Sequence, residues 1–149
     1  MAKFRLQTVL DLKQRLEDAQ QRELGMLTQQ RLRAEEALQY LAAQEREQEE
    51  ALASRVHGGR LHIDEVRSAM SYIDGVRASI VAQRDRAAEL EARIRDSRTR
   101  LTEIARERNV LERLRERHTE SEAVESGRRD QRAADELTSQ RYARQAWEV

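Results

Sequence analysis

A 3.5-residue apolar repeat runs through the second half of the chain and constrains the fold more than any other feature. Alternating steps of 3 and 4 from Val66 reach sixteen positions, of which eleven are apolar. In order these positions are Val66, Ala69, Ile73, Val76, Ile80, Gln83, Ala87, Leu90, Ile94, Ser97, Leu101, Ile104, Arg108, Leu111, Arg115 and His118. A repeat held for more than seven heptads predicts a helix that supercoils around a partner helix.

The first half of the chain carries the same repeat, with one predicted dislocation. Val9, Leu12, Leu16 and Ala19 belong to one heptad frame. Leu24, Leu27, Ala34, Leu38, Leu41 and Leu52 belong to a frame shifted by one residue. Because a straight helix drifts by about 20° per heptad, a one-residue skip near Gly25 is expected to restore the apolar stripe. The stripe becomes polar at Glu45 and Gln48, which predicts weaker packing there.

Between the two halves lies His57-Gly58-Gly59, which contains the only adjacent glycines in the chain. Glycine tolerates positive φ and commonly ends helices, so we expect the chain to reverse here. Asp64 is expected to cap the second helix. The predicted fold is all-α: a long two-stranded antiparallel coiled-coil hairpin with a C-terminal helix overhang. As a single domain over 1–149, it comprises a helix at 3–57, a turn at 58–63 and a helix at 64–145.

The register of the hairpin follows from its turn. With the reversal at 58–59, residue i of the first helix should lie beside residue about 117 − i of the second, because both helices rise by about 1.5 Å per residue. Phe4 is then expected near Arg113. Residues after about His118 have no partner helix, so they form the overhang.

Composition excludes several classes of protein. Apolar and charged residues each make up 38% of the chain, aromatics make up 3%, and proline is absent. This composition can fill a narrow seam between two helices but not the centre of a globule. The 28 basic and 28 acidic residues balance, which argues against nucleic acid as a partner.

The same sequence offers no catalytic chemistry. It contains no cysteine, and its histidines are His57, His62 and His118. His57 and His62 are close in sequence, but no third metal ligand stands near them, so we expect no metal and no cofactor. A two-helix rod lacks the concave pocket that enzymes use, and no enzymatic activity is expected. The start of the chain lacks the apolar stretch of a signal peptide, and no window approaches the ~18 apolar residues of a membrane span, which predicts a cytoplasmic protein.

Two surfaces are not explained by the apolar stripe. The first is near the glycine turn and comprises Tyr40, Leu41, Gln44, Gln48, Tyr72, Val76 and Gln83. Packing at the edge of the seam is the alternative interpretation of this group. The second is the open end of the hairpin, with Phe4, Leu6, Leu10, Leu137, Tyr142, Ala146 and Trp147. Exposed apolar groups on an unpaired helix are typical either of docking into a groove or of disorder.

Several motifs occur in an order that resembles a known family. They are residues 3–10 (KFRLQTVL), residues 33–38 (RAEEAL), the glycine turn and residues 130–137 (DQRAADEL). Together with the chain length, they resemble the flagellar export protein FliJ family, the central-stalk family of type III secretion, over residues 3–145. The residues leave open whether the export system is flagellar or an injectisome.

The resemblance implies a function that the repeat itself does not. In that family the end bearing both termini is held in the hexameric export ATPase ring, and the rod engages the cytoplasmic domain of the export gate protein. The family also implies roles in ring assembly and in handling export chaperones, with a peripheral position at the cytoplasmic face of the inner membrane. The expected form is a monomeric hairpin.

The resemblance also implies two sets of binding residues. The gate set, matched by register, is Leu41, Gln44, Gln48, Tyr72, Val76, Ser79 and Gln83. The chain departs from the family here: Gln44 and Gln48 stand where aromatic residues are expected, and Gln83 stands where a histidine is expected. The ring set is Phe4, Arg5, Leu6, Asp130, Gln131, Asp135 and Glu136.

An alternative function remains open at this point. The two halves could form one continuous helix across Gly58-Gly59, about 200 Å long, that dimerises through its seam as a structural or scaffolding protein. Solution mass would separate such an extended dimer from a monomeric hairpin.

Overall fold

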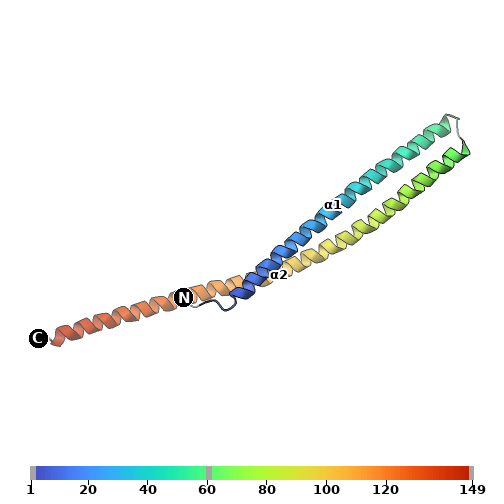
Figure 1. The fold of residues 1–149 in the computed structure, drawn as a ribbon. Coiled ribbons are helices and arrows are strands. Elements are labelled where there is room, and N and C mark those ends of the chain that lie inside the picture. The colour runs from blue at the N-terminus through green and yellow to red at the C-terminus, as the bar shows by residue number, and fades with distance from the viewer. Residues whose placement is uncertain (1–2, 60–61, 148–149) are drawn as a thin grey trace. The chain divides into compact units, whose positions relative to one another are not determined.

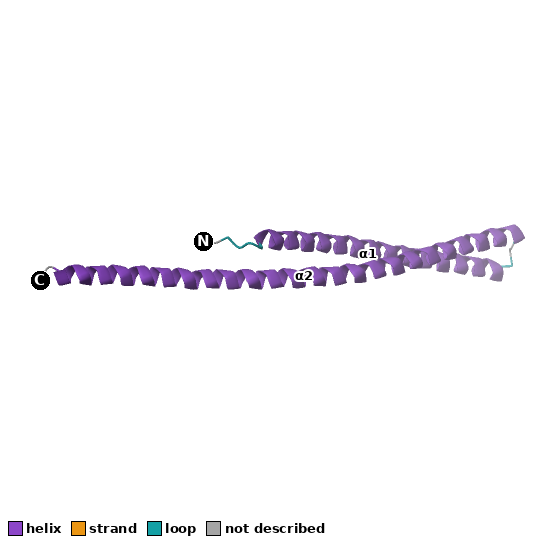
Figure 2. Cartoon of the chain, turned by 90° about the horizontal axis from the view of Figure 1, so that it is seen from below, coloured by secondary structure: helices purple, strands orange, loops and turns teal. Residues whose placement is uncertain are grey.

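The computed structural model describes residues 3–59 and 62–147, which form two long helices. Helix α1 spans Gln7–His57 and helix α2 spans Ile63–Trp147. The two helices pack against each other in opposite directions (Figures 1 and 2), and the described residues contain no strand. The predicted all-α coiled-coil hairpin is therefore confirmed, and the continuous helix that the scaffolding alternative required does not form.

The helix ends differ from the predicted ones by a few residues. Helix α1 begins at Gln7 rather than at residue 3, and the Gln7 amide donates to the Phe4 carbonyl at 3.1 Å. Helix α2 begins at Ile63, and the His62 carbonyl accepts from the amides of Glu65 and Val66 at 3.0 and 3.2 Å. Asp64 therefore lies in the first turn of α2 rather than at its cap, where its negative charge suits the helix dipole.

Helix α1 ends at the glycine pair, as predicted. The Gly58 amide still donates to the Ser54 carbonyl at 3.1 Å, whereas Gly59 has a φ of +66°. This left-handed conformation is strained for a residue with a Cβ and costs glycine little, so Gly59 ends the helix. Residues 60–61, inside the predicted turn, lie outside the described part of the chain.

The predicted seam of α2 is confirmed. Fifteen of its sixteen positions are buried or half-buried, and Arg115 is the exposed exception. The buried residues of α2 are Ile73, Val76, Ile80, Leu90, Ile94 and Ser97, all of them in the seam. Leu90 and Ile94 meet Leu27 and Ala34 of α1 in one core cluster.

The predicted dislocation in α1 is wrong. Val9, Leu12, Leu16 and Ala19 are exposed. The observed seam keeps one heptad frame through Leu10, Lys13, Glu17, Gln20, Leu24, Leu27, Arg31, Ala34, Leu38, Leu41, Glu45, Gln48 and Leu52, all of them buried or half-buried. Polar positions of α1 face polar positions of α2, as Glu17 does with Arg108 and Gln20 with Ser97, which explains why no skip occurs.

The observed register is about one helical turn from the predicted one. Side-chain contacts between the helices join residues whose numbers add to between 116 and 126, rather than to about 117. Phe4 accordingly stacks on His118, not on Arg113, with ring centroids 5.7 Å apart. The shift arises because the helices end at His57 and resume at Ile63, which places the centre of the turn beyond Gly59.

The chain divides into two compact units. The tip unit comprises Asp18–Thr102, and the terminal unit comprises Met1–Glu17 with Glu103–Val149. Each unit contains part of α1 and part of α2, so each is a two-helix unit in its own right. The expectation of a single domain over 1–149 stays a prediction.

Candidate partner-binding surfaces

The gate set lies entirely in the tip unit, and one contact defines its exposed side. The Tyr72 hydroxyl donates to Oε1 of Gln44 at 3.4 Å across the two helices, with Tyr72 49% exposed. Ser79 lies two turns beyond Tyr72 on α2, and Tyr40 lies one turn before Gln44 on α1, so both share this side. Tyr40 and Ser79 are exposed. An aromatic and amide surface therefore follows one edge of the seam.

The other members of the gate set belong to the seam. Val76 is buried between the helices, and Leu41, Gln48 and Gln83 are half-buried there. Their side chains pack the two helices together, which matches the interpretation of seam-edge packing. Of the seven residues, Tyr72 and Ser79 are exposed, and Gln44 is half-buried beside Tyr72.

The opposite edge of the tip seam is closed by ion pairs. Arg77 Nε and Nη2 donate to Glu45 and Glu49, each at 2.6 Å. The hydrogen bond to Glu45, followed by that to Glu49, raises the pKa of Arg77. Because Arg77 follows Tyr72 by five residues, its side chain lies about 140° further round α2. The two edges of the seam thus differ: one is occupied by charge pairs, and the other presents Tyr72.

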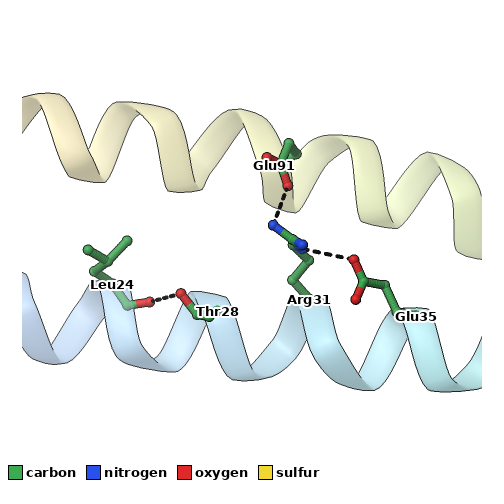
Figure 3. A network of polar contacts seen from close by, with 5 residues as sticks. All are labelled: Leu24, Thr28, Arg31, Glu35 and Glu91. Carbon is green, nitrogen blue, oxygen red and sulfur yellow. Dashed lines mark hydrogen bonds and ion pairs between the residues drawn. The ribbon is translucent and has the colours of Figure 1, made fainter.

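A second group of ion pairs joins α1 and α2 of the tip unit further along the same edge of the seam (Figure 3). Arg31 on α1 donates to Glu35 one turn later at 3.0 Å and to Glu91 on α2 at 3.1 Å. Its pKa is raised, first by the hydrogen bond to Glu35 and then by the charges of Glu35 and Glu91. These pairs hold the register of the two helices rather than forming a site for a ligand.

The first part of the ring set precedes α1 in the terminal unit. Phe4 is half-buried against His118, with an angle of 59° between the ring planes. Arg5 and Leu6 are exposed, and the Leu6 carbonyl accepts from the Leu10 amide at 2.9 Å. The stack of Phe4 on His118 therefore fixes the start of the chain on the side of α2.

The second part of the ring set lies on the unpaired tail of α2. Asp130, Gln131, Asp135 and Glu136 are exposed, as is every described residue from 123 to 147. Gln131 Nε2 donates to Asp135 Oδ1 at 3.4 Å, one turn along the same helix. Asp130 follows His118, the partner of Phe4, by twelve residues, or about 18 Å of helix. The structure thus places both parts in one unit without bringing them into contact.

A feature that the sequence interpretation missed is an exposed apolar face on the terminal unit. Val9, Leu12 and Leu16 of α1 and Val110 and Leu114 of α2 are all exposed. The sequence signal for this face is the first apolar frame of α1, which a heptad interpretation places in the seam. The observed frame gives the seam Lys13 and Glu17 instead, and it leaves the leucines outside.

These observations define a class of protein: an all-α coiled-coil hairpin whose candidate sites are helix surfaces. The chain belongs to the FliJ family, since residues 1–146 match the family described as flagellar FliJ protein. It is thereby a component of the flagellar export apparatus, in a family of non-enzymatic export components. Comparisons with curated proteins and with solved structures gave no match.

The described helices also bear on membrane insertion. Within residues 3–59 and 62–147, neither helix is apolar enough over the length that a membrane span requires.

Proposed function

We propose that this chain is a non-enzymatic central stalk that links the hexameric flagellar export ATPase to the cytoplasmic domain of the export gate protein. The observation that supports this most directly is the separation of the two candidate sets. The gate set lies in the tip unit and the ring set lies in the terminal unit. Helix α2 contributes to both sets and is helical throughout Ile63–Trp147. A continuous helix can carry a displacement from one partner to the other.

The ring would hold the terminal unit. The exposed tail of α2 combines carboxylates at Asp130, Asp135 and Glu136 with exposed Leu137 and Tyr142. These side chains have no contact with α1, so they are free of a structural role in the hairpin and suit recognition by a partner. Assembly of the ring around this tail would account for the promotion of ATPase assembly and substrate export that the family implies.

The gate would contact the tip unit at the Tyr72 edge. Tyrosine is among the residues that contribute most at protein interfaces, because it combines a large apolar ring with a hydroxyl. The opposite edge is occupied by the Arg77 and Arg31 ion pairs. We therefore place the gate contact on Tyr72, Gln44 and Ser79. Handling of export chaperones and a peripheral position at the inner membrane belong to the same proposal.

Turnover of the cognate ATPase, measured with and without this chain, tests the ring contact. We expect stimulation and co-purification with the wild-type chain, and loss of both with Asp135→Arg combined with Glu136→Arg. Glu89→Arg, an exposed charge reversal in the tip unit, is the matched control and should behave as wild type. Absence of stimulation by the wild-type chain would show that it is not a stalk for this ATPase.

Binding of the purified cytoplasmic domain of the gate tests the second contact. Tyr72→Ala should weaken binding by roughly tenfold or more, in the range of interface hot spots. Tyr142→Ala removes the same side chain from the terminal unit and should leave gate binding unchanged. Equal losses for the two variants would contradict the placement of the gate contact on the tip unit.

Solution mass provides a separate check on the oligomeric state. Because α1 and α2 satisfy each other's seam within one chain, we expect a monomer by sedimentation equilibrium. A stable dimer at micromolar concentration would contradict the monomeric hairpin and favour the scaffolding function instead.

A further inference from the structure

Five of the exposed apolar residues of the terminal unit fall in two rows, one on each helix. Val9, Leu12 and Leu16 are spaced by three and four residues, so they follow one side of α1. Val110 and Leu114 are four residues apart and follow one side of α2. The exposed fractions of these five side chains lie between 39% and 57%.

An ion pair shows that the two rows lie on the same side of the helix pair. Lys13 on α1 binds Glu107 on α2. Val9 and Leu16 lie four residues before and three residues after Lys13, and Val110 and Leu114 lie three and seven residues after Glu107. Residues at these spacings share a face of the helix with the charged residue. The two apolar rows therefore run along the two sides of the Lys13–Glu107 pair.

This face conflicts with the pattern of an isolated hairpin. Beside Leu10, the seam of this part of α1 contains Lys13 and Glu17, whereas Leu12 and Leu16 lie outside it. Apolar side chains on the exposed face and charges in the seam lower the stability of a two-helix unit. Local departures of this kind from the folding pattern are expected at binding sites. A third helix over the face would bury both rows.

The charges around the face indicate the chemistry of that helix. Arg106, Arg113 and Arg117 flank Val110 and Leu114 at spacings of three and four residues, and Arg15 lies three residues after Leu12. All four arginines are exposed. The carboxylates in the same rows of α2 are Glu103, Glu107 and Glu120, and Glu107 is already bound by Lys13. An apolar groove rimmed by arginine complements a helix with an apolar stripe and acidic flanks.

We propose that the face formed by Val9, Leu12, Leu16, Val110 and Leu114 binds an acidic amphipathic helix of a partner protein, giving a local three-helix bundle. Packed helices have axes about 8–10 Å apart, so two neighbouring helices offer a groove of the width that one further helix fills. The Lys13–Glu107 pair in this groove disfavours a lipid surface, because acyl chains would desolvate both charges without offering hydrogen bonds. This helix-binding site goes beyond the stalk function and does not use the tail of α2.

A labelled model peptide tests the proposal. The probe is a fluorescein-labelled helix of about three heptads, with Leu at positions a and d and Glu at e and g. Fluorescence anisotropy with the full chain should show binding roughly tenfold tighter than that of the same peptide with Lys at e and g. Equal binding of the two peptides, or binding of neither, would overturn the proposal.

Paired variants locate the site. Leu12→Ser with Val110→Ser should weaken binding of the acidic peptide by roughly tenfold, through lost apolar burial. Met70→Ser with Val81→Ser removes two exposed apolar side chains from the tip unit and should leave binding unchanged. Arg15→Glu with Arg113→Glu should reverse the preference in favour of the basic peptide. If this variant still prefers the acidic peptide, Arg15 and Arg113 do not select the acidic flanks of the bound helix.

Other occupants of the face give distinct results. Self-association of the wild-type chain that Leu12→Ser with Val110→Ser abolishes would assign the face to a second copy and overturn the proposal. Face-dependent flotation with phosphatidylglycerol vesicles would assign it to a membrane, and displacement of the peptide by the export ATPase would assign it to the ring. Peptide binding is read without ATPase turnover, so its failure and the failure of the stalk function are distinguishable.

Discussion

The two units of the chain are built from the same two helices but are held together differently. In the tip unit the buried part of the seam is mainly apolar, with Ile73, Val76, Ile80, Leu90 and Ile94 buried. Among the described residues of the terminal unit, Leu10 is the one fully buried apolar side chain. Its seam relies on Lys13 with Glu107 and on Arg108 with Glu17 and Glu112. The comparison teaches that one continuous helix can take part in an apolar seam in one unit and in a seam with more charged contacts in the other.

Physical chemistry gives the two seams different strengths. Burial of aliphatic side chains stabilises the tip unit in proportion to the area removed from water. Ion pairs that remain partly solvated contribute little and are screened by salt. The hydrogen bonds of Arg108 to Glu17 and then to Glu112 raise its pKa, so the arginine stays charged, but its contribution still depends on geometry. We therefore expect the terminal unit to open before the tip unit does.

The largest effect is expected from Ile94→Ala in the tip unit. Ile94 is 1% exposed, so its truncation should lower the free energy of unfolding by about 2–5 kcal/mol. Ile63→Ala, at a position 77% exposed, is the matched control and should stay within about 0.5 kcal/mol of wild type. Thermal unfolding followed by circular dichroism measures both. A small loss for Ile94→Ala would show that the apolar cluster does not dominate the tip unit.

Two leucines of α1 sharpen the comparison inside the terminal unit. Leu10 is 0% exposed and Leu12 is 53% exposed. Leu10→Ala should release the start of α1 and raise the amide exchange of residues 7–17 toward that of an unpaired helix. Leu12→Ala should leave this exchange close to wild type. A larger rise in amide exchange for Leu12→Ala than for Leu10→Ala would show that the seam uses the frame of Val9, Leu12, Leu16 and Ala19.

The frame of Val9, Leu12, Leu16 and Ala19 shows which parts of the fold the sequence determines and which parts it does not. The sequence predicts the helices, the reversal at Gly58-Gly59 and all of the α2 seam except Arg115, because the apolar residues there occupy one frame. In α1 before Leu24 two frames compete, and apolarity favours the wrong one. The choice depends on which α2 residues lie opposite: Arg108 and Ser97 select Glu17 and Gln20. Choosing between the two frames therefore requires the pairing register of α1 and α2, and the register predicted from the sequence differs from the observed one by about one helical turn.

The candidate sites could be predicted only as regions. The family implies a gate contact near Tyr72, and the structure shows Tyr72 and Ser79 exposed there. It also shows Val76 buried in the seam, which a match by register cannot distinguish from an exposed contact. The exposed face of Val9, Leu12 and Leu16 was hidden for the opposite reason, since apolar heptad positions are normally assigned to the core. The observed frame, with Lys13 and Glu17 in the seam, changes that assignment.

A smaller effect is expected at a polar layer in the seam of the tip unit, where Gln20 meets Ser97. Gln20 Nε2 donates to Ser97 Oγ at 2.7 Å, and Ser97 is buried. Ser97→Ala should cost about 0.5–1.5 kcal/mol, because Gln20 loses one acceptor and keeps Glu23 at 3.1 Å. Adding Gln20→Leu should recover most of this loss, since no polar group then remains unpaired. Chemical denaturation of the two variants measures the difference, and no recovery would show that the layer's role is packing.

The smallest effect concerns the ion pairs of the terminal seam and is best measured as a salt dependence. Added salt screens partly exposed pairs such as Lys13 with Glu107, but it strengthens apolar burial when the anion is excluded from the surface. Between low and moderate sodium chloride, amide exchange of residues 7–17 should become modestly faster, while that of residues 87–97 should not. Glu17→Gln should reduce this salt dependence by removing the carboxylate that Arg108 binds. Equal salt responses in the two segments would mean that the terminal seam is held by Leu10 and the half-buried Ile104 and Leu111 rather than by charge.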